Sequence, residues 1–193
     1  MKLTSDMALK LLDEARNITP NTNWIEHSIC VGRAASVIAD ALNLDGEKAK
    51  TLGYIHDIGK RIGDFHNHAI NGYNYLKELG VDDEYCRICL THSYLNNDVY
   101  CTAGGVPPVT EFLQNFLKDY EYSIYDKIIN LCDLMCTSKI LTVDKRLIDI
   151  LIRRGAYPNT QYHVIETYKL KDYIDGLLGH CVYDLFPEIK ENL

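Results

Sequence analysis

Apolar residues recur at intervals of three and four along most of the chain, which is the spacing of amphipathic helices. Runs of strict alternation are few, so the pattern predicts no β-sheet. The segment 95–109 contains Ala-Gly-Gly-Val-Pro-Pro, whose prolines exclude a helix, and we expect it to be a connection that flanks a pocket. The remaining pattern predicts helices over residues 5–18, 22–42, 47–59, 68–79, 82–94, 110–119, 123–140, 143–154 and, with weaker periodicity, 161–189.

Length and composition favour a single globular, all-α domain. The chain has 193 residues, of which 47% are hydrophobic and 24% charged, so it can bury a core of its own. The formal net charge of −7 argues against a nucleic-acid partner, which would be bound chiefly by clustered Lys and Arg. A small anionic substrate is compatible with this charge, because a bound metal can reverse the local field.

The sequence also predicts a cytoplasmic protein with reduced cysteines and no membrane partner. No stretch approaches the roughly 20 apolar residues that cross a bilayer, and the first residues are too polar and acidic for a signal peptide. Seven scattered cysteines form an odd set, which is unlike a secreted disulfide framework. Cys86 and Cys89 make one C-x-x-C, but no second pair completes a Cys₄ zinc site, so we expect small apolar residues on a helix.

Several His and Asp residues occupy helix faces that are otherwise apolar. His27, His56 and His92 each fall on the apolar stripe of a different predicted helix. Asp57 lies at the edge of the stripe that contains His56, and Asp133 lies within the apolar face of a fourth helix. An unpaired buried carboxylate costs several kcal/mol, so these positions need cationic partners. Divalent cations between the helices would satisfy all five side chains, because imidazole and carboxylate groups suit Fe, Mn, Zn or Mg.

The order and spacing of these residues resemble a known family. The segment Tyr54–Lys60, YIHDIGK, looks like the signature of the HD superfamily of metal-dependent phosphohydrolases. His27 stands upstream of His56-Asp57 and Asp133 downstream, as in that superfamily. The resemblance covers about residues 22–140 and implies one helical HD-type domain over 1–193, in which 141–193 forms a C-terminal helical extension.

Two further histidines indicate a branch of the superfamily that holds two metals. His68 opens the run HAINGYNYL, and His92 stands in LTHSY, as in the small bacterial branch that includes the symmetrical diadenosine tetraphosphate hydrolases. His66 competes with His68 for the same role, and we favour His68 because it heads a helix. The resemblance implies that Asp57 bridges the two cations, Fe or Mn before Zn or Mg, with one metal held by His27, His56, Asp57 and Asp133 and the other by Asp57, His68 and His92.

The activity implied by this resemblance is hydrolysis of a phosphoester or phosphoanhydride in a small phosphorylated substrate, such as a nucleotide or dinucleoside polyphosphate. In this hypothesis a metal-bound hydroxide oriented by Asp57 attacks phosphorus. Lys60 reaches a non-bridging oxygen as a point charge, although a cation at a helix C-terminus explains the same residue. Weaker substrate contacts are expected from Arg61, Ser93 and Asn96, and some of Tyr73, Tyr75, Tyr94 and Tyr100 could stack on a base, although packing is the simpler role.

Two alternatives remain open at the level of sequence. One is a nucleotide-sensing HD module without turnover, and the other is a single-metal 5'-nucleotidase that uses only His27, His56, Asp57 and Asp133. Residues after Asp133 run LMCTSKILTVDKR, which departs from the acidic and arginine-containing stretch usual in the diadenosine tetraphosphate hydrolases. His163 and His180 have no motif around them and are expected to be structural or exposed. The sequence leaves the oligomeric state open, and a homo-oligomer fits it.

Overall fold

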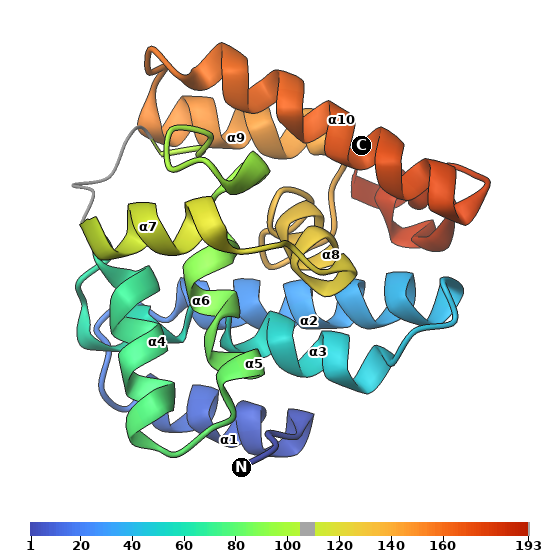
Figure 1. The fold of residues 1–193 in the computed structure, drawn as a ribbon. Helices are drawn as coiled ribbons and strands as arrows, with labels where there is room; N and C mark the ends of the chain where they lie inside the picture. The colour runs from blue at the N-terminus through green and yellow to red at the C-terminus, as the bar shows by residue number, and fades with distance from the viewer. Residues whose placement is uncertain (105–110, 193) are drawn as a thin grey trace.

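The computed structural model describes residues 1–104 and 111–192, and within them the protein is helical throughout (Figure 1). The only β-type pairing among the described residues is an isolated bridge between Cys136 and Ile140. The predicted all-α class is therefore confirmed. The α-helices are α1 Ser5–Arg16, α2 Asn23–Ala41, α3 Gly46–Ile55, α4 His68–Glu78, α5 Asp83–Cys86, α6 Ile88–Thr91, α7 Glu111–Asp119, α8 Ile124–Asp133, α9 Val143–Arg154 and α10 Thr160–Leu178. Short 3₁₀ helices are η1 Ile58–Ile62, η2 Leu95–Asn97, η3 Val182–Leu185 and η4 Pro187–Asn192.

The helices α2 and α3 pack closely at the centre of the molecule, with α8 against α2 and α1 on the opposite side (Figure 1). The close approach of α2 and α3 depends on two glycines that face each other. A β-carbon at Gly53 would lie 2.4 Å from the α-carbon of Gly32, where any side chain would force the helices apart. This contact holds the faces that carry His27 and His56 together.

A second glycine contact joins the end of the signature segment to α4. A β-carbon at Gly59 would lie 2.0 Å from the carbonyl oxygen of His68. Gly72, one turn into α4, faces Gly59 in turn, because a β-carbon there would lie 3.0 Å from the Gly59 nitrogen. The two backbones can touch only because both positions lack side chains, and this brings the start of α4 next to Asp57.

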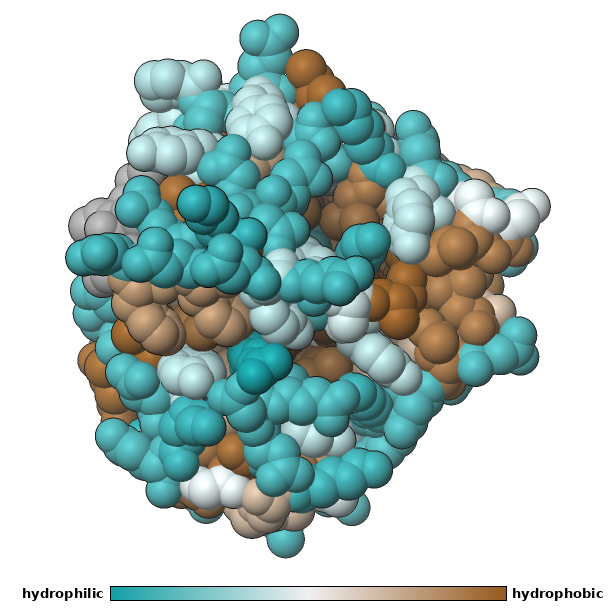
Figure 2. Space-filling model, in the orientation of Figure 1, coloured by the Kyte–Doolittle hydropathy of each residue, from teal (hydrophilic) through white to brown (hydrophobic). Residues whose placement is uncertain are grey.

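Local capping explains where the helices that frame the cavity begin. Ser123 caps α8 in a capping box with Asp126, whose carboxylate also accepts a hydrogen bond from the Thr91 hydroxyl at 2.7 Å. Thr142 caps α9 through a hydrogen bond from the Lys145 backbone N–H. The helices α9 and α10 then lie side by side in a layer above α2 and α8 (Figure 1). Hydrophilic side chains cover most of the face seen in Figure 2, and apolar ones gather near the C-terminal segment.

Four predicted helices end earlier than the sequence pattern indicates or are interrupted. The helix expected over 161–189 ends at Leu178, because Gly179 adopts a left-handed conformation with φ 76° and terminates α10. The helix expected to reach Gly59 ends at Ile55, because the chain tightens into a turn at Asp57, with φ −103° and ψ 8°, and continues as η1. The helix expected over 123–140 ends at Asp133, where the Met135 N–H bonds to the carbonyl of Cys132 in a 3₁₀ turn. The helix expected over 82–94 is interrupted at Arg87, whose carbonyl accepts from the Leu90 N–H in the same tighter geometry.

Candidate metal centre

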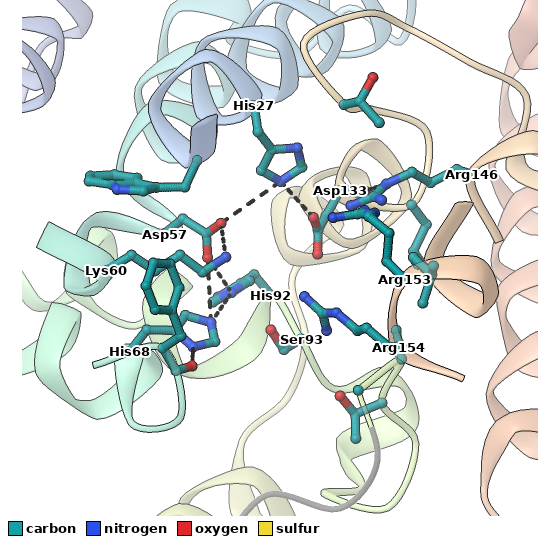
Figure 3. Close-up of a pocket in the computed structure, with 18 of the residues that line it drawn as sticks. His27, Asp57, Lys60, His68, His92, Ser93, Asp133, Arg146, Arg153 and Arg154 are labelled. Atoms are coloured by element: carbon teal, nitrogen blue, oxygen red, sulfur yellow. Dashed lines mark hydrogen bonds and ion pairs between the residues drawn. The ribbon is translucent and has the colours of Figure 1, made fainter. Parts of the chain in front are cut away.

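Asp57 lies at the centre of a cluster of buried and half-buried histidines (Figure 3). Its side chain is 1% exposed, and its two oxygens face different partners. The Oδ1 atom lies 3.4 Å from the Nε2 atom of His68 and 3.3 Å from that of His92. The Oδ2 atom lies 3.5 Å from His56 Nε2 and 3.9 Å from His27 Nε2. One carboxylate thus stands between two pairs of imidazoles.

The ligand atoms fall into two groups of metal-site dimensions. Those of His27, His56 and Asp57 lie within 4.8 Å of one another, and so do those of Asp57, His68 and His92. Asp133, the last residue of α8, adjoins the first group, because its Oδ1 atom lies 2.8 Å from His27 Nε2 and 4.0 Å from His56 Nε2. The side chains come from separate elements, which the helix packing brings together.

Backbone carbonyls fix the orientation of three of the imidazole rings. The Nδ1 atoms of His56, His68 and His92 lie 2.6, 2.8 and 3.2 Å from the carbonyl oxygens of Gly53, Phe65 and Ile88, respectively. A carbonyl can only accept, so each Nδ1 carries the proton and each Nε2 presents its lone pair to the centre. This is the arrangement that second-sphere partners impose on metal-binding histidines.

Several buried polar atoms at the centre have no hydrogen-bond partner among the described residues. They include His56 Nε2 and Asp57 Oδ1, both of which point into the cluster. Unpaired buried nitrogen and oxygen atoms are costly, and native proteins rarely leave them so. A divalent cation would satisfy these atoms, because neutral imidazole and carboxylate groups are suitable ligands for it. The residues therefore fit a divalent-metal site.

The ionisation of the cluster agrees with this interpretation. Burial lowers the pKa of His56 to about 4 and that of His68 to about 3, so both rings are neutral near pH 7. Burial opposes ionisation of Asp57, but Lys60 and the surrounding histidines outweigh it and hold the carboxyl pKa well below its usual range. Burial likewise opposes ionisation of Asp133, but the hydrogen bond that it accepts from His27 and the charges of His27 and His56 together outweigh burial and lower its pKa. Neutral imidazoles beside ionised carboxylates are the protonation states that bind a cation.

The cluster lies at the base of a cavity of about 720 Å³, which is the size of a small-molecule site. Lys60 lines the cavity, and its ammonium group bonds to the Asp57 carboxylate. Ser93 and His163 also line it, and Arg146, Arg153 and Arg154 of α9 form its far wall (Figure 3).

Comparison with known proteins agrees with the geometry of this centre. The family model described as "HD domain" matches residues 24–137, which include His27, the His56-Asp57 pair and Asp133. The chain belongs to the HD domain family. The resemblance found in the sequence is therefore confirmed.

Among curated proteins, the HD-domain chain is similar to ribonuclease Y of Chlorobium chlorochromatii, with 38% identity over 63 residues, or 32% of this chain and 12% of that protein. It is also similar to ribonuclease Y of Lactobacillus helveticus, with 37% identity over 93 residues, or 46% of this chain and 15% of that protein. The chain thus spans 15% or less of the length of these two relatives.

A solved structure shares the fold. The HD domain of the phosphodiesterase PgpH from L. monocytogenes superposes with a TM-score of 0.50 and 16% identity, over 88% of this chain and 95% of that one. None of the described helices of the HD-domain chain is long and apolar enough to cross a lipid bilayer.

The structure places the weaker sequence candidates in different surroundings. His66 is exposed, whereas His68 faces Asp57 and His92. Arg61 stacks over the Tyr75 ring at 4.1 Å and does not line the HD-domain cavity. Asn96 donates to Glu166 at 2.6 Å, also outside this cavity. Of the four tyrosines proposed near the site, Tyr73, Tyr75, Tyr94 and Tyr100, none is among the described lining residues.

Sequence reasoning missed much of the cavity wall. Trp24 and Phe65 are aromatic lining residues to which the sequence pattern gave no role in the site. His163, expected to be structural or exposed, is buried and lines the cavity. Only one feature of the sequence pointed to the three arginines. The predicted helix that follows Asp133, the final Asp of the HD-domain pattern, carries basic residues. The predicted irregular segment does flank the pocket, through Leu95 and 102–104, although residues 105–110 lie outside the described part of the chain.

Proposed function

We propose that this HD-domain protein is a metal-dependent phosphohydrolase that cleaves a phosphoester or phosphoanhydride bond in a nucleotide or dinucleoside polyphosphate. The observation that carries the proposal is the position of Asp57, whose two oxygens face separate histidine pairs at 3.3–3.9 Å. Family membership supports the reaction class, and the cavity of about 720 Å³ supports a small substrate.

Two divalent cations are proposed, of which Fe and Mn fit the mixed imidazole and carboxylate ligands best. In this proposal one cation is held by His27, His56, Asp57 and Asp133, and the other by Asp57, His68 and His92. Such a pair of ions lowers the pKa of water and stabilises charge on phosphate oxygens.

The residues around the cluster would bind and orient the substrate. Lys60 lies on the cavity side of Asp57 and can hold a non-bridging phosphate oxygen as a point charge. Ser93 follows His92 directly and can donate its hydroxyl proton to another oxygen. Trp24 offers an aromatic face along the wall, where a nucleobase could stack. Asp57 orients the attacking water, which makes Asp57 and Lys60 the proposed catalytic residues.

The first test is metal analysis of the purified protein, followed by turnover of a panel of nucleotides and dinucleoside polyphosphates by the wild type and by Asp57→Ala. The proposal expects bound metal and hydrolysis that Asp57→Ala abolishes. Two bound metals without turnover across the panel would favour a nucleotide-sensing module. Absence of metal under all loading conditions would contradict the site itself.

A further inference from the structure

The cavity of the proposed phosphohydrolase has a second chemical feature, on the wall opposite Lys60. Arg146, Arg153 and Arg154 come from one face and the end of α9, and all three line the cavity that contains Asp57. In Figure 3, Arg153 and Arg154 extend from α9 towards the histidine cluster. We call these three residues the α9 arginine cluster. Such a concentration of positive charge is unexpected in a chain whose net charge is −7.

The members of the α9 arginine cluster are not equally available to a ligand. Arg146 is 8% exposed, and it donates to Asp149 at 2.6 Å and to the carbonyl oxygen of Asp133 at 3.4 Å. It therefore ties α9 to the end of α8 and helps to position Asp133. Arg153 makes two hydrogen bonds to the same Asp149 carboxylate, at 3.0 and 2.5 Å. One acidic residue is thus shared by two arginines.

Arg154 has no ion pair within residues 1–104 and 111–192, and its side chain is exposed. Its guanidinium lies close to Gly104, where a β-carbon would be 2.8 Å from Arg154 Nη1. Because Asp149 is shared by Arg146 and Arg153, the α9 arginine cluster keeps uncompensated positive charge that faces the metal centre.

A simpler explanation is that Arg153 and Arg154 only complement the dipole at the C-terminus of α9. The dipole accounts for basic residues in the last turn, and solvent-directed side chains would serve it equally well. It does not account for two adjacent guanidinium groups that both line the cavity. Planar, multidentate guanidinium groups are suited to phosphate oxygens, which is a role the dipole does not require.

We propose that Arg153 and Arg154 form a second anion subsite, which binds a phosphate group of the substrate other than the one at the metal centre. This inference rests on the proposed function and narrows it to nucleotides with a chain of two or more phosphates. A nucleoside monophosphate has no second phosphate to offer. A nucleic-acid chain is disfavoured by the net charge of −7.

The test compares wild type, Arg154→Ala and Arg153→Ala/Arg154→Ala, with Arg33→Ala as a control. Arg33 is an exposed residue of α2 that does not line the cavity, so its variant removes one positive charge elsewhere. The single Arg154→Ala variant is easier to interpret than the double variant, because it leaves Asp149 paired with Arg146 and Arg153. Folding of each variant is checked by its Tm. The kcat and KM values are measured with adenosine monophosphate and adenosine triphosphate.

The subsite predicts that Arg154→Ala raises KM for the triphosphate by about tenfold or more, as for loss of a charged hydrogen bond, and changes the monophosphate values by less than about twofold. Arg154→Lys should restore part of the loss, and Arg33→Ala should match wild type. Equal losses on both substrates, no loss on either, or cleavage of a short RNA that Arg154→Ala does not impair would overturn the inference.

A binding measurement separates this inference from the proposed reaction. Inorganic tripolyphosphate and orthophosphate are titrated calorimetrically into metal-loaded wild type and Arg154→Ala. Tripolyphosphate should bind wild type more tightly than orthophosphate, and Arg154→Ala should lose that preference. If no substrate is turned over but this preference is found, the proposed function fails and the subsite stands. If turnover is found without the preference, the subsite fails alone.

Discussion

His68 and His92 face each other with their Nε2 atoms 3.1 Å apart, although the Nδ1 proton of each ring is directed at a backbone carbonyl. Two unprotonated nitrogens at this distance repel each other unless a cation or a proton lies between them. The nearby Asp57 Oδ1 atom adds a third lone pair, at 3.4 Å from His68 and 3.3 Å from His92. These two nitrogens and the carboxylate oxygen therefore need a positive charge between them.

Metal should stabilise the folded protein for this reason. A ligand that binds only the folded state, present at a hundred times its Kd, adds about 2.7 kcal/mol. For a chain of this size that corresponds to a rise in Tm of roughly 5–10 °C. Differential scanning fluorimetry with EDTA, and then with Mn²⁺, checks the prediction. A Tm that does not respond to either addition would count against the metal centre.

His66 and His68, which the sequence offered as alternatives for one metal ligand, allow a matched comparison. His68→Ala removes a ring that faces Asp57, whereas His66→Ala removes an exposed ring two residues earlier in the chain. We expect His68→Ala to reduce bound metal from two ions to one and to lower kcat/KM by at least about a hundredfold. His66→Ala should keep both the metal content and the rate. Nearly intact activity in His68→Ala would instead indicate a single-metal enzyme.

The contact between η1 and α4 should be intolerant of any side chain at Gly59. A β-carbon there would lie 2.0 Å from the His68 carbonyl oxygen, which belongs to rigid backbone. Gly59→Ala should lower the free energy of unfolding by about 2 kcal/mol or more and weaken metal binding, because α4 must move away from Asp57. Urea denaturation and metal analysis of the variant measure both effects.

Gly176→Ala provides the control for that substitution. Gly176 lies within α10, and a β-carbon there would meet no atom within 4 Å. Alanine loses less conformational entropy than glycine in a helix, so this variant should be more stable by about 0.5–1 kcal/mol. If both variants behaved alike, the close approach at Gly59 would not be the cause of the loss.

His163 should make the stability of the metal-free protein depend on pH. Burial lowers its pKa to about 4, whereas the unfolded chain takes up a proton near the ordinary histidine value of about 6.5. The unfolded state therefore binds more protons between these values, and stability falls as the pH is lowered from 6.5 towards 4. His163→Gln cannot take up this proton, so its free energy of unfolding should fall less steeply over the same range. Urea denaturation at several pH values in EDTA measures both slopes, and parallel slopes would refute the assignment.

The metal cluster could be predicted from sequence because its signal is local. His27, His56 and His92 interrupt apolar stripes, and each stripe is defined within a single helix. The end of α8 at Asp133 was missed, because the helical spacing continues beyond it while the chain turns into a 3₁₀ geometry. The paired glycines show why the helices meet so closely, yet glycine alone in a sequence does not reveal its partner across the core.

The basic residues of the α9 arginine cluster are visible in the sequence, but the direction of their side chains could not be predicted. Exposed basic residues near the end of a helix are common, and their direction depends on how α9 is placed in the fold. Arg146 is fixed by its hydrogen bond to the Asp133 carbonyl, which is a tertiary contact. Division of the chain into a core at 22–140 and an extension at 141–193 stays a prediction. So does the relation to diadenosine tetraphosphate hydrolases.

The central claim is that Asp57 bridges two divalent cations, and metal content measures it most directly. Wild type and Asp57→Ala are loaded with Mn²⁺, freed of excess metal and analysed by inductively coupled plasma mass spectrometry, with folding checked by circular dichroism. We expect two ions per chain in the wild type and the loss of both in the folded variant. A wild type without bound metal, or an Asp57→Ala protein that keeps its full complement, would contradict it.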